Sequence, residues 1–274
     1  MQDCVTDAMV IGEEMTEAQG GPFLIHRGIL NSARTLMRTL VSKNILKDSF
    51  EHWSSDYELI VTGHSLGGGV ALALGLLLKQ HHTNLNVFAF APPLGTLCDR
   101  AADYMKEWAL VVVNEKCMFS RMSYYTMLDL KKRMIKALET CKTPKYRLLE
   151  KTYCSLLGCM RAEHVESGSE DYTYRLTDSK SLVNFLRKDF YNKITSAQKN
   201  KVMPTMSGRR VLLLVRRVAG NGSGLAVLVG AEQLQTLLVH KTMLTDHFLK
   251  SINMSLDKLC EFNDPDSVRK LKEQ

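Results

Sequence analysis

The sequence predicts an α/β fold in which a mostly parallel sheet is flanked by helices. Short runs of β-branched and apolar residues alternate with longer segments of helical periodicity, which is the pattern of strand–helix–strand units. The pentapeptide Gly63-His64-Ser65-Leu66-Gly67 lies between one such run and a small, apolar segment, and it fits the G-x-S-x-G pattern of a tight strand-to-helix turn. At 274 residues the chain can bury one full core, so we expect a single domain over residues 1–274.

The first part of the chain supplies the elements around this turn. Apolar residues at helical spacing predict a helix over residues 29–46. Residues 57–62 are rich in β-branched and apolar side chains and predict a buried strand, while the small, apolar residues 68–78 predict a buried helix. Two further buried strands are expected at residues 86–91 and 109–113.

The second part of the chain is less regular. Residues 126–139 predict a basic amphipathic helix. Residues from about 141 to 207 carry polar runs with little periodicity, so we expect an irregular insertion in the domain. The remaining expected elements are a hairpin of residues 210–215 and 225–229, a short apolar run at 234–239, and a helix over 246–259 with Thr245 as its candidate N-cap.

Composition and charge exclude several classes of function. The net charge is +7, but aromatic residues make up only 7% and no nucleic-acid-binding motif is found, so we expect no nucleic-acid partner. The charge favours either attraction to anionic lipid headgroups or a solvated basic surface with no partner. No stretch reaches the roughly 18 uninterrupted apolar residues of a membrane span, and the first residues lack a signal-peptide pattern. The seven cysteines are scattered and lack zinc-type spacing, which predicts reduced thiols and neither metal nor cofactor.

Ser65 has the position of a nucleophile on this turn. A serine hydroxyl needs a base to take its proton, and in this architecture the chain order is serine, acid, histidine. Among the histidines, His240 and His247 come late enough, and His247 precedes the last expected helix, so we expect it to be the base. Gly63 and Gly67 are expected to let the strained turn pass close to its neighbours. The helix N-terminus at this turn offers N–H groups to a developing oxyanion.

Several segments beyond the pentapeptide follow one known pattern. In chain order they are residues 2–7, His26-Arg27-Gly28, residues 59–71, Phe90-Ala91-Pro92-Pro93, and residues 128–133, 141–146 and 243–247. Together they resemble the class 3, fungal lipase-like family of lipases, and within it the sn-1-specific diacylglycerol lipases. The resemblance covers residues 1 to about 150 and about 208 to 255.

The resemblance implies an α/β-hydrolase fold and a serine lipase that needs no metal. It implies that Ser65 is the nucleophile, that His247 is the general base, and that the Leu66 N–H belongs to the oxyanion hole. The implied reaction is hydrolysis of the sn-1 ester of diacylglycerol, or a related lipid ester, to a 2-monoacylglycerol and a fatty acid. It also implies a regulatory role for the insertion at about 141–207. The implied location is the cytoplasmic face of a membrane, while the net charge favours peripheral contact with an anionic membrane.

Two departures from the family pattern lead to a second hypothesis. Cys117 occupies the position of the catalytic acid, and a neutral thiol does not stabilise an imidazolium as a carboxylate does. Glu115 or Asp99 could replace that acid from a neighbouring strand end, whereas Asp246, adjacent to His247, is poorly placed. The family's first strands, one of which gives the second oxyanion donor, would lie upstream of Met1, so we expect a truncated sheet. The alternative function is therefore a catalytically impaired lipase-fold protein that binds lipid or a partner.

Three lesser alternatives also follow from the residues. The chain could be a soluble esterase of smaller esters. Cys117 could itself be a nucleophile, with Lys116 and Arg121 as the cationic neighbours that would lower its pKa. The basic residues of the 126–139 helix could contact a membrane surface, although such a charge run is more often a solvated face; they are Lys131, Lys132, Arg133 and Lys136.

Overall fold

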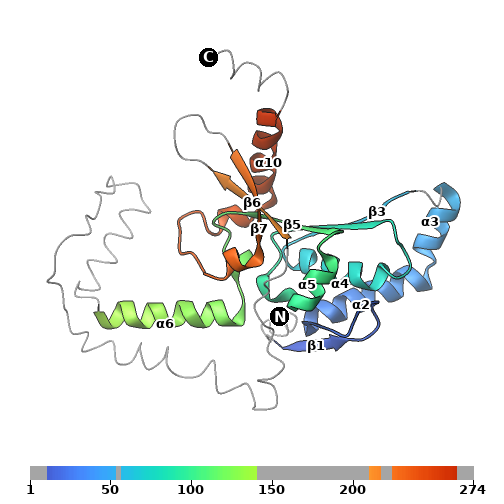
Figure 1. Cartoon of the computed structure of the whole chain (residues 1–274), viewed down its shortest axis with the longest axis horizontal. Helices are drawn as coiled ribbons and strands as arrows, with labels where there is room; N and C mark the ends of the chain where they lie inside the picture. Colours follow the sequence, from blue (N-terminus) through green and yellow to red (C-terminus); the bar gives the residue numbers. More distant parts are fainter. Residues whose placement is uncertain (1–10, 54–56, 141–209, 217–223, 264–274) are drawn as a thin grey trace. The chain divides into compact units, whose positions relative to one another are not determined.

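The main sheet of the computed structural model is mostly parallel, as the sequence predicts (Figure 1). The structure describes residues 11–53, 57–140, 210–216 and 224–263. Within these ranges, five strands follow the order β3-β4-β5-β6-β7. The first four run parallel, and β7 pairs antiparallel with β6 to form the expected hairpin. Their bounds are β3 Leu59–His64, β4 Leu85–Phe90, β5 Ala109–Asn114, β6 Arg210–Arg216 and β7 Gly224–Gly230.

A separate two-stranded sheet precedes the main one. β1 (Gly12–Met15) and β2 (Phe23–His26) pair antiparallel, with Met15 opposite Phe23. Both of these side chains are completely buried, so the small sheet contributes to the core. These two strands were not predicted, because neither Gly-Glu-Glu-Met nor Phe-Leu-Ile-His alternates apolar and polar residues.

The helices cover the sheet in two groups. α4 (Leu66–Leu78) packs on β3, β4 and α2 (Arg27–Ser42), whereas α10 (Leu249–Asn263) packs on β5, β6 and β7. Residues 71–78 of α4 are all buried, which confirms the expected buried helix behind the G-x-S-x-G turn. The shorter helices are α5 Asp99–Met105 and the 3-10 helices η1 Leu94–Thr96, η2 Phe119–Arg121, η3 Ala231–Leu234 and η4 Thr245–His247.

The helix expected over residues 29–46 is in fact two helices. α2 ends at Ser42, and α3 (Ile45–Trp53) follows after Asn44. Asn44 has a φ of 51°, a left-handed conformation that asparagine adopts more readily than most residues and that ends a helix. The apolar pattern continues through this break, which is why periodicity alone joined the two helices.

Two expectations near the end of the chain are corrected. Thr245 does not cap the last helix: its hydroxyl donates to the Thr242 carbonyl, at 3.1 Å, and the residue begins η4. The last helix begins at Leu249, and the Phe248 carbonyl accepts from Ser251 and Ile252 in its first turn. The apolar run at 234–239 forms no strand, although Leu234 and Leu237 are buried.

The chain divides into two compact units, residues 1–127 with 196–274, and residues 128–195. The described residues of the second unit, 128–140, belong to α6 (Tyr124–Thr140), which confirms the expected basic helix. The predicted insertion at about 141–207 lies outside the described residues, and a single domain over 1–274 stays a prediction. No helix in the described ranges is both long and apolar enough to cross a membrane.

Candidate active site

Ser65 occupies a strained turn between β3 and α4. Its φ of 56° and ψ of −126° are unfavourable for any residue with a Cβ. Three backbone hydrogen bonds hold this conformation. The Ser65 N–H donates to the Phe90 carbonyl at 2.9 Å, and the Ser65 carbonyl accepts from Gly68 at 2.9 Å and from Gly69 at 3.2 Å. The turn is thus fixed by β4 on one side and by the first turn of α4 on the other.

The two glycines of the turn have different roles. A Cβ added at Gly63 would lie 2.2 Å from the Gly67 carbonyl oxygen and 2.5 Å from the Gly67 carbonyl carbon. A side chain at position 63 is therefore excluded by backbone. A Cβ at Gly67 would meet no described atom within 4 Å. The prediction of a close approach is confirmed for Gly63 and wrong for Gly67.

His247 lies beside Ser65, although 182 residues separate them in the chain. Its Nε2 is 2.8 Å from the Ser65 Oγ. The imidazole is buried, with its ring centroid 4.1 Å from that of Phe119 and 4.7 Å from that of His64. Burial, and to a lesser extent the neighbouring His64, lower the pKa of His247 to about 4. The imidazole is therefore neutral near pH 7 and can accept a proton.

A thiol faces the other nitrogen of the same ring. The Cys117 Sγ is 3.5 Å from the His247 Nδ1 and 3.5 Å from the Ser120 Oγ. Cys117 is completely buried at the end of β5, in the turn that leads to η2. Ser65, His247 and Cys117 thus form a chain of contacts like that of a catalytic triad. The cysteine has the place that a carboxylate has in the triad.

The carboxylates considered as substitutes do not reach the imidazole. Within the described residues, the ring nitrogens of His247 have two hydrogen-bond partners, Ser65 and Cys117. Glu115 pairs with the neighbouring Lys116, at 2.6 Å, and Asp99 lies in the first turn of α5. This geometry contradicts the hypothesis that Glu115 or Asp99 replaces the missing acid. The Asp246 carboxylate accepts from the Thr242 hydroxyl, at 3.2 Å, so it too is directed away from the ring of its neighbour.

Leu66 is the first residue of α4 and directly follows Ser65. The first N–H groups of a helix have no partner within the helix, and the helix dipole is positive at this end. The Leu66 N–H is one of these groups. The described residues contain no group of three or more potential metal-ligating side chains.

Parts of the chain are similar to known lipases. Residues 1–122 match the family model of class 3 lipases. This part of the chain is therefore similar to the class 3 lipases. Diacylglycerol lipase-beta of Mus musculus is 31% identical over 155 residues, which are 54% of this chain and 22% of that protein. Diacylglycerol lipase-alpha of Homo sapiens is 31% identical over 153 residues, which are 54% of this chain and 15% of that protein. The match thus spans less than a quarter of either relative.

Solved lipase structures are also similar to part of the chain. The lipase from Rhizopus microsporus var. chinensis is 23% identical with a TM-score of 0.38, over 44% of this chain and 43% of that one. The Rhizomucor miehei triacylglyceride lipase is 24% identical with a TM-score of 0.37, over 44% of this chain and 46% of that one. The assignment of the α/β-hydrolase fold depends on the chain's own features, namely a mostly parallel sheet, a serine turn after β3, and a histidine after the last strand.

An open groove of about 730 Å³ begins at the serine turn. It is mainly apolar and runs along β3, α2 and α4; the residues that line it include Leu36, Val61, Gly63, Leu66, Gly67, Val70 and Leu74. Leu36 and Leu66, which both line it, are 46% and 41% exposed, so apolar surface lies open at the serine turn.

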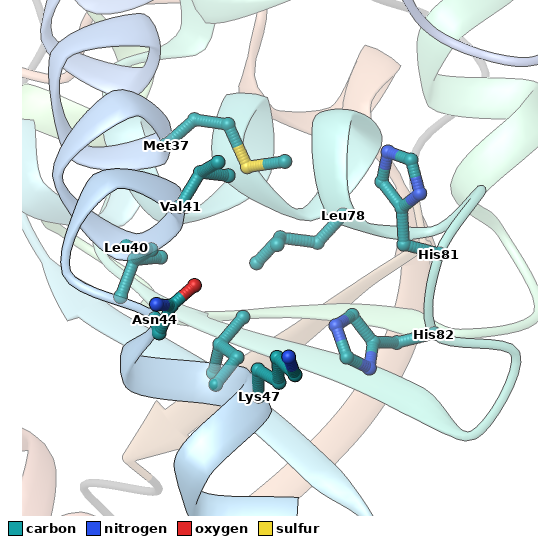
Figure 2. Close-up of a pocket in the computed structure, with 9 residues that line it drawn as sticks. Met37, Leu40, Val41, Asn44, Lys47, Leu78, His81 and His82 are labelled. Carbon is teal, nitrogen blue, oxygen red and sulfur yellow. The ribbon is translucent and has the colours of Figure 1, made fainter.

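A second, smaller hollow lies at the opposite end of α4 (Figure 2). Its volume is about 210 Å³, and His81, His82 and Leu78 line one side of it while Met37 and Val41 of α2 line another. Burial and the neighbouring His81 lower the pKa of His82. This hollow contains no residue of the serine turn, because His81 and His82 follow the far end of α4.

Two buried side chains attach loops near His247, a role that was not predicted from the sequence. The buried Asn114 side chain donates to the Asp246 carbonyl at 3.0 Å and so attaches that loop to the end of β5. Arg121 is 4% exposed and donates to the carbonyls of Gln233, Thr236 and Glu115. One signal was available: Asn114 is the polar last residue of an otherwise apolar strand, and site residues in a parallel sheet usually lie at the carboxyl ends of strands.

Proposed function

We propose that the chain is a serine hydrolase of lipid esters, and that diacylglycerol is its substrate. The observation that carries this proposal is the 2.8 Å contact between the Ser65 Oγ and the His247 Nε2, with Ser65 on a strained turn at the end of a parallel strand. The names of the diacylglycerol lipases that share 31% identity with this chain supply the substrate. The exposed apolar groove beside Ser65 suits a long acyl chain.

The mechanism follows from the position of each group. The Ser65 oxygen attacks the sn-1 ester carbonyl while His247 takes its proton through Nε2. The negative charge that develops on the carbonyl oxygen is stabilised by the Leu66 N–H. His247 then gives the proton to the leaving glyceride oxygen, and 2-monoacylglycerol departs. A water molecule, deprotonated by His247, hydrolyses the acyl-serine and releases the fatty acid.

A fluorophosphonate probe tests this proposal, because it forms a covalent bond with an activated serine. We expect one label per chain, lost in Ser65→Ala and retained in the matched variant Ser49→Ala, which removes an exposed hydroxyl on α3. Incubation with a diacylglycerol that carries two different acyl chains should release the sn-1 chain alone. Folded protein that neither takes up the probe nor releases fatty acid would contradict the proposal.

The exposed side chains around His247 support contact with a lipid surface. Leu244, Phe248 and Leu249 flank His247 in the chain and are 48%, 59% and 46% exposed. Exposed apolar residues beside a site for lipid esters can enter the surface that contains the substrate. We expect the protein to sediment with anionic phospholipid vesicles, and Phe248→Ser to weaken that binding. The basic residues of α6 are expected to make the binding salt-dependent.

One observation favours a second function. The Cys117 thiol, and not a carboxylate, contacts the His247 Nδ1. In serine proteases, loss of this carboxylate lowers the rate about 10⁴-fold. The chain would then be a lipase-fold protein that binds lipid without efficient turnover. Cys117→Asp separates the two functions. If the acid is the missing element, ester turnover should rise by about 10²-fold or more, and unchanged turnover would show that another element is absent.

A further inference from the structure

Four side chains form one row of hydrogen bonds through the candidate site. The Ser120 Oγ lies 3.5 Å from the Cys117 Sγ, this sulfur lies 3.5 Å from the His247 Nδ1, and the His247 Nε2 lies 2.8 Å from the Ser65 Oγ. We call Ser120, Cys117, His247 and Ser65 the proton row. A hydroxyl, a thiol and a neutral imidazole each donate one hydrogen and accept another. The hydrogens can therefore run along the row in either of two directions.

The catalytic direction starts at Ser65. Its hydroxyl donates to the His247 Nε2, the Nδ1–H donates to the Cys117 sulfur, and the thiol donates to the Ser120 oxygen. The hydrogen of the Ser120 hydroxyl then has no acceptor within the row. Ser120 is only 1% exposed, and within the described residues its hydroxyl bonds with Cys117 alone. A buried donor without an acceptor costs free energy, so this direction is disfavoured by the unsatisfied hydroxyl of Ser120.

The opposite direction starts at Ser120. Its hydroxyl donates to the Cys117 sulfur, the thiol donates to the His247 Nδ1, and the Nε2–H donates to the Ser65 oxygen. The hydroxyl without an acceptor in the row is now that of Ser65. This residue is partly exposed at a turn that lines an open groove, so its hydroxyl can donate to solvent. Every buried donor in the row has an acceptor. An aspartate at position 117 could only accept, which would permit the catalytic direction alone.

We propose that Ser120 holds His247 in the tautomer whose Nε2 carries the hydrogen, so that Ser65 is not activated in the resting protein. Ser120 is in this sense a positioning residue that acts through Cys117. The inference builds on the proposed serine hydrolase, because it describes the resting state of the same base. The lowered pKa of His247 is consistent with it, since a neutral ring near pH 7 carries a single hydrogen.

The tautomer can be observed directly. In ¹⁵N-labelled full-length protein at pH 7, the two ring nitrogens of His247 have separate resonances that show which one carries the hydrogen, and His247→Gln assigns them. We expect Nε2–H in the unmodified protein and in Ser120→Thr, which keeps the hydroxyl. We expect a shift toward Nδ1–H in Ser120→Ala. Ser255→Ala removes another hydroxyl of a buried serine, in α10, and should leave the spectrum unchanged.

Reactivity gives an independent readout. Removal of the Ser120 hydroxyl should increase fluorophosphonate labelling of Ser65 about tenfold, because the penalty on the catalytic direction disappears. An Nδ1–H resonance in the unmodified protein would overturn the inference, and so would a doubly protonated ring, which indicates a thiolate–imidazolium pair. If the resonances shift as expected but no variant is labelled, the proposed function fails while the assignment of the tautomer stands.

Discussion

His64 donates a hydrogen bond from its Nε2 to the backbone carbonyl of His247, at 2.7 Å. A carbonyl only accepts, so this contact fixes the hydrogen of His64 on Nε2. The bond joins the residue before the candidate nucleophile to the backbone of the candidate base. Since the two ring centroids are also 4.7 Å apart, the serine turn and the His247 loop are held as one unit.

His64→Phe should loosen this unit without leaving a large cavity. The phenyl ring keeps most of the packing against His247, but the carbonyl of His247 loses its donor, which costs about 1–3 kcal/mol. We also expect the pKa of His247 to rise, because the charge of His64 contributes to its lowering. Urea unfolding and an NMR titration measure the two effects. The exposed His81, changed to Phe, is the matched control and should alter neither quantity; equal effects in both variants would refute a specific role for His64.

The two glycines of the turn should respond in opposite ways to the same added methyl group. Gly63→Ala places a Cβ within 2.5 Å of Gly67 backbone atoms, so we expect little folded protein. Gly67→Ala meets no described atom and replaces a glycine in a helix, so we expect a gain of about 0.5–1 kcal/mol. Thermal unfolding of the purified proteins makes the comparison. A stable Gly63→Ala protein would show that the turn is looser than its geometry indicates.

Patterns that are local in the sequence predicted most of the main sheet. β3, β4 and β5 are short runs of apolar and β-branched residues, and the helix of small residues after Ser65 is buried along most of its length. The pairing of Ser65 with His247 was also predicted, because the order of groups in this architecture leaves few histidines to choose from. These features depend on periodicity and chain order, which the sequence contains.

Other features depend on contacts between distant residues, which the sequence does not contain. The backbone conformation of Asn44 divides one apolar periodicity into two helices. The Cys117 thiol was expected at the acid position, but its contact with Ser120 required the fold of the turn between β5 and η2. The role of a buried hydroxyl depends on which acceptors surround it, so Ser120 could not be distinguished from any other serine in the sequence.

Ser65→Gly should make the protein more stable while it removes the candidate nucleophile. The φ of 56° and ψ of −126° are unfavourable for serine and for alanine but accessible to glycine. Relief of this strain is worth about 1–3 kcal/mol, of which the entropy of glycine in the unfolded chain offsets about 1 kcal/mol. We therefore expect Ser65→Gly to unfold at a higher temperature than Ser65→Ala in calorimetry. If Ser65→Ala is as stable as Ser65→Gly, the turn stores no strain.

The free energy of unfolding should decrease as the pH is lowered through a range that is set by the pKa of His247. Its pKa is about 4 in the folded protein and has its ordinary value, 6.5, in the unfolded chain. Between these values the unfolded chain binds more protons, so the free energy of unfolding decreases as the pH falls from 6.5 to 4. The loss from this one residue amounts to about 3 kcal/mol below pH 4. Urea unfolding at several pH values measures it.

His247→Gln isolates this contribution, because carboxylates titrate in both proteins and cancel in the difference. We expect the difference in unfolding free energy between the two proteins to change across pH 4 to 6.5 and to stay constant above pH 7. If His247 is also the general base, kcat/KM for an ester should keep its neutral-pH value down to about pH 5. A decline centred on pH 6.5 in both measurements would mean that the imidazole is solvated, and therefore that the buried position beside Ser65 is not the one it occupies in solution.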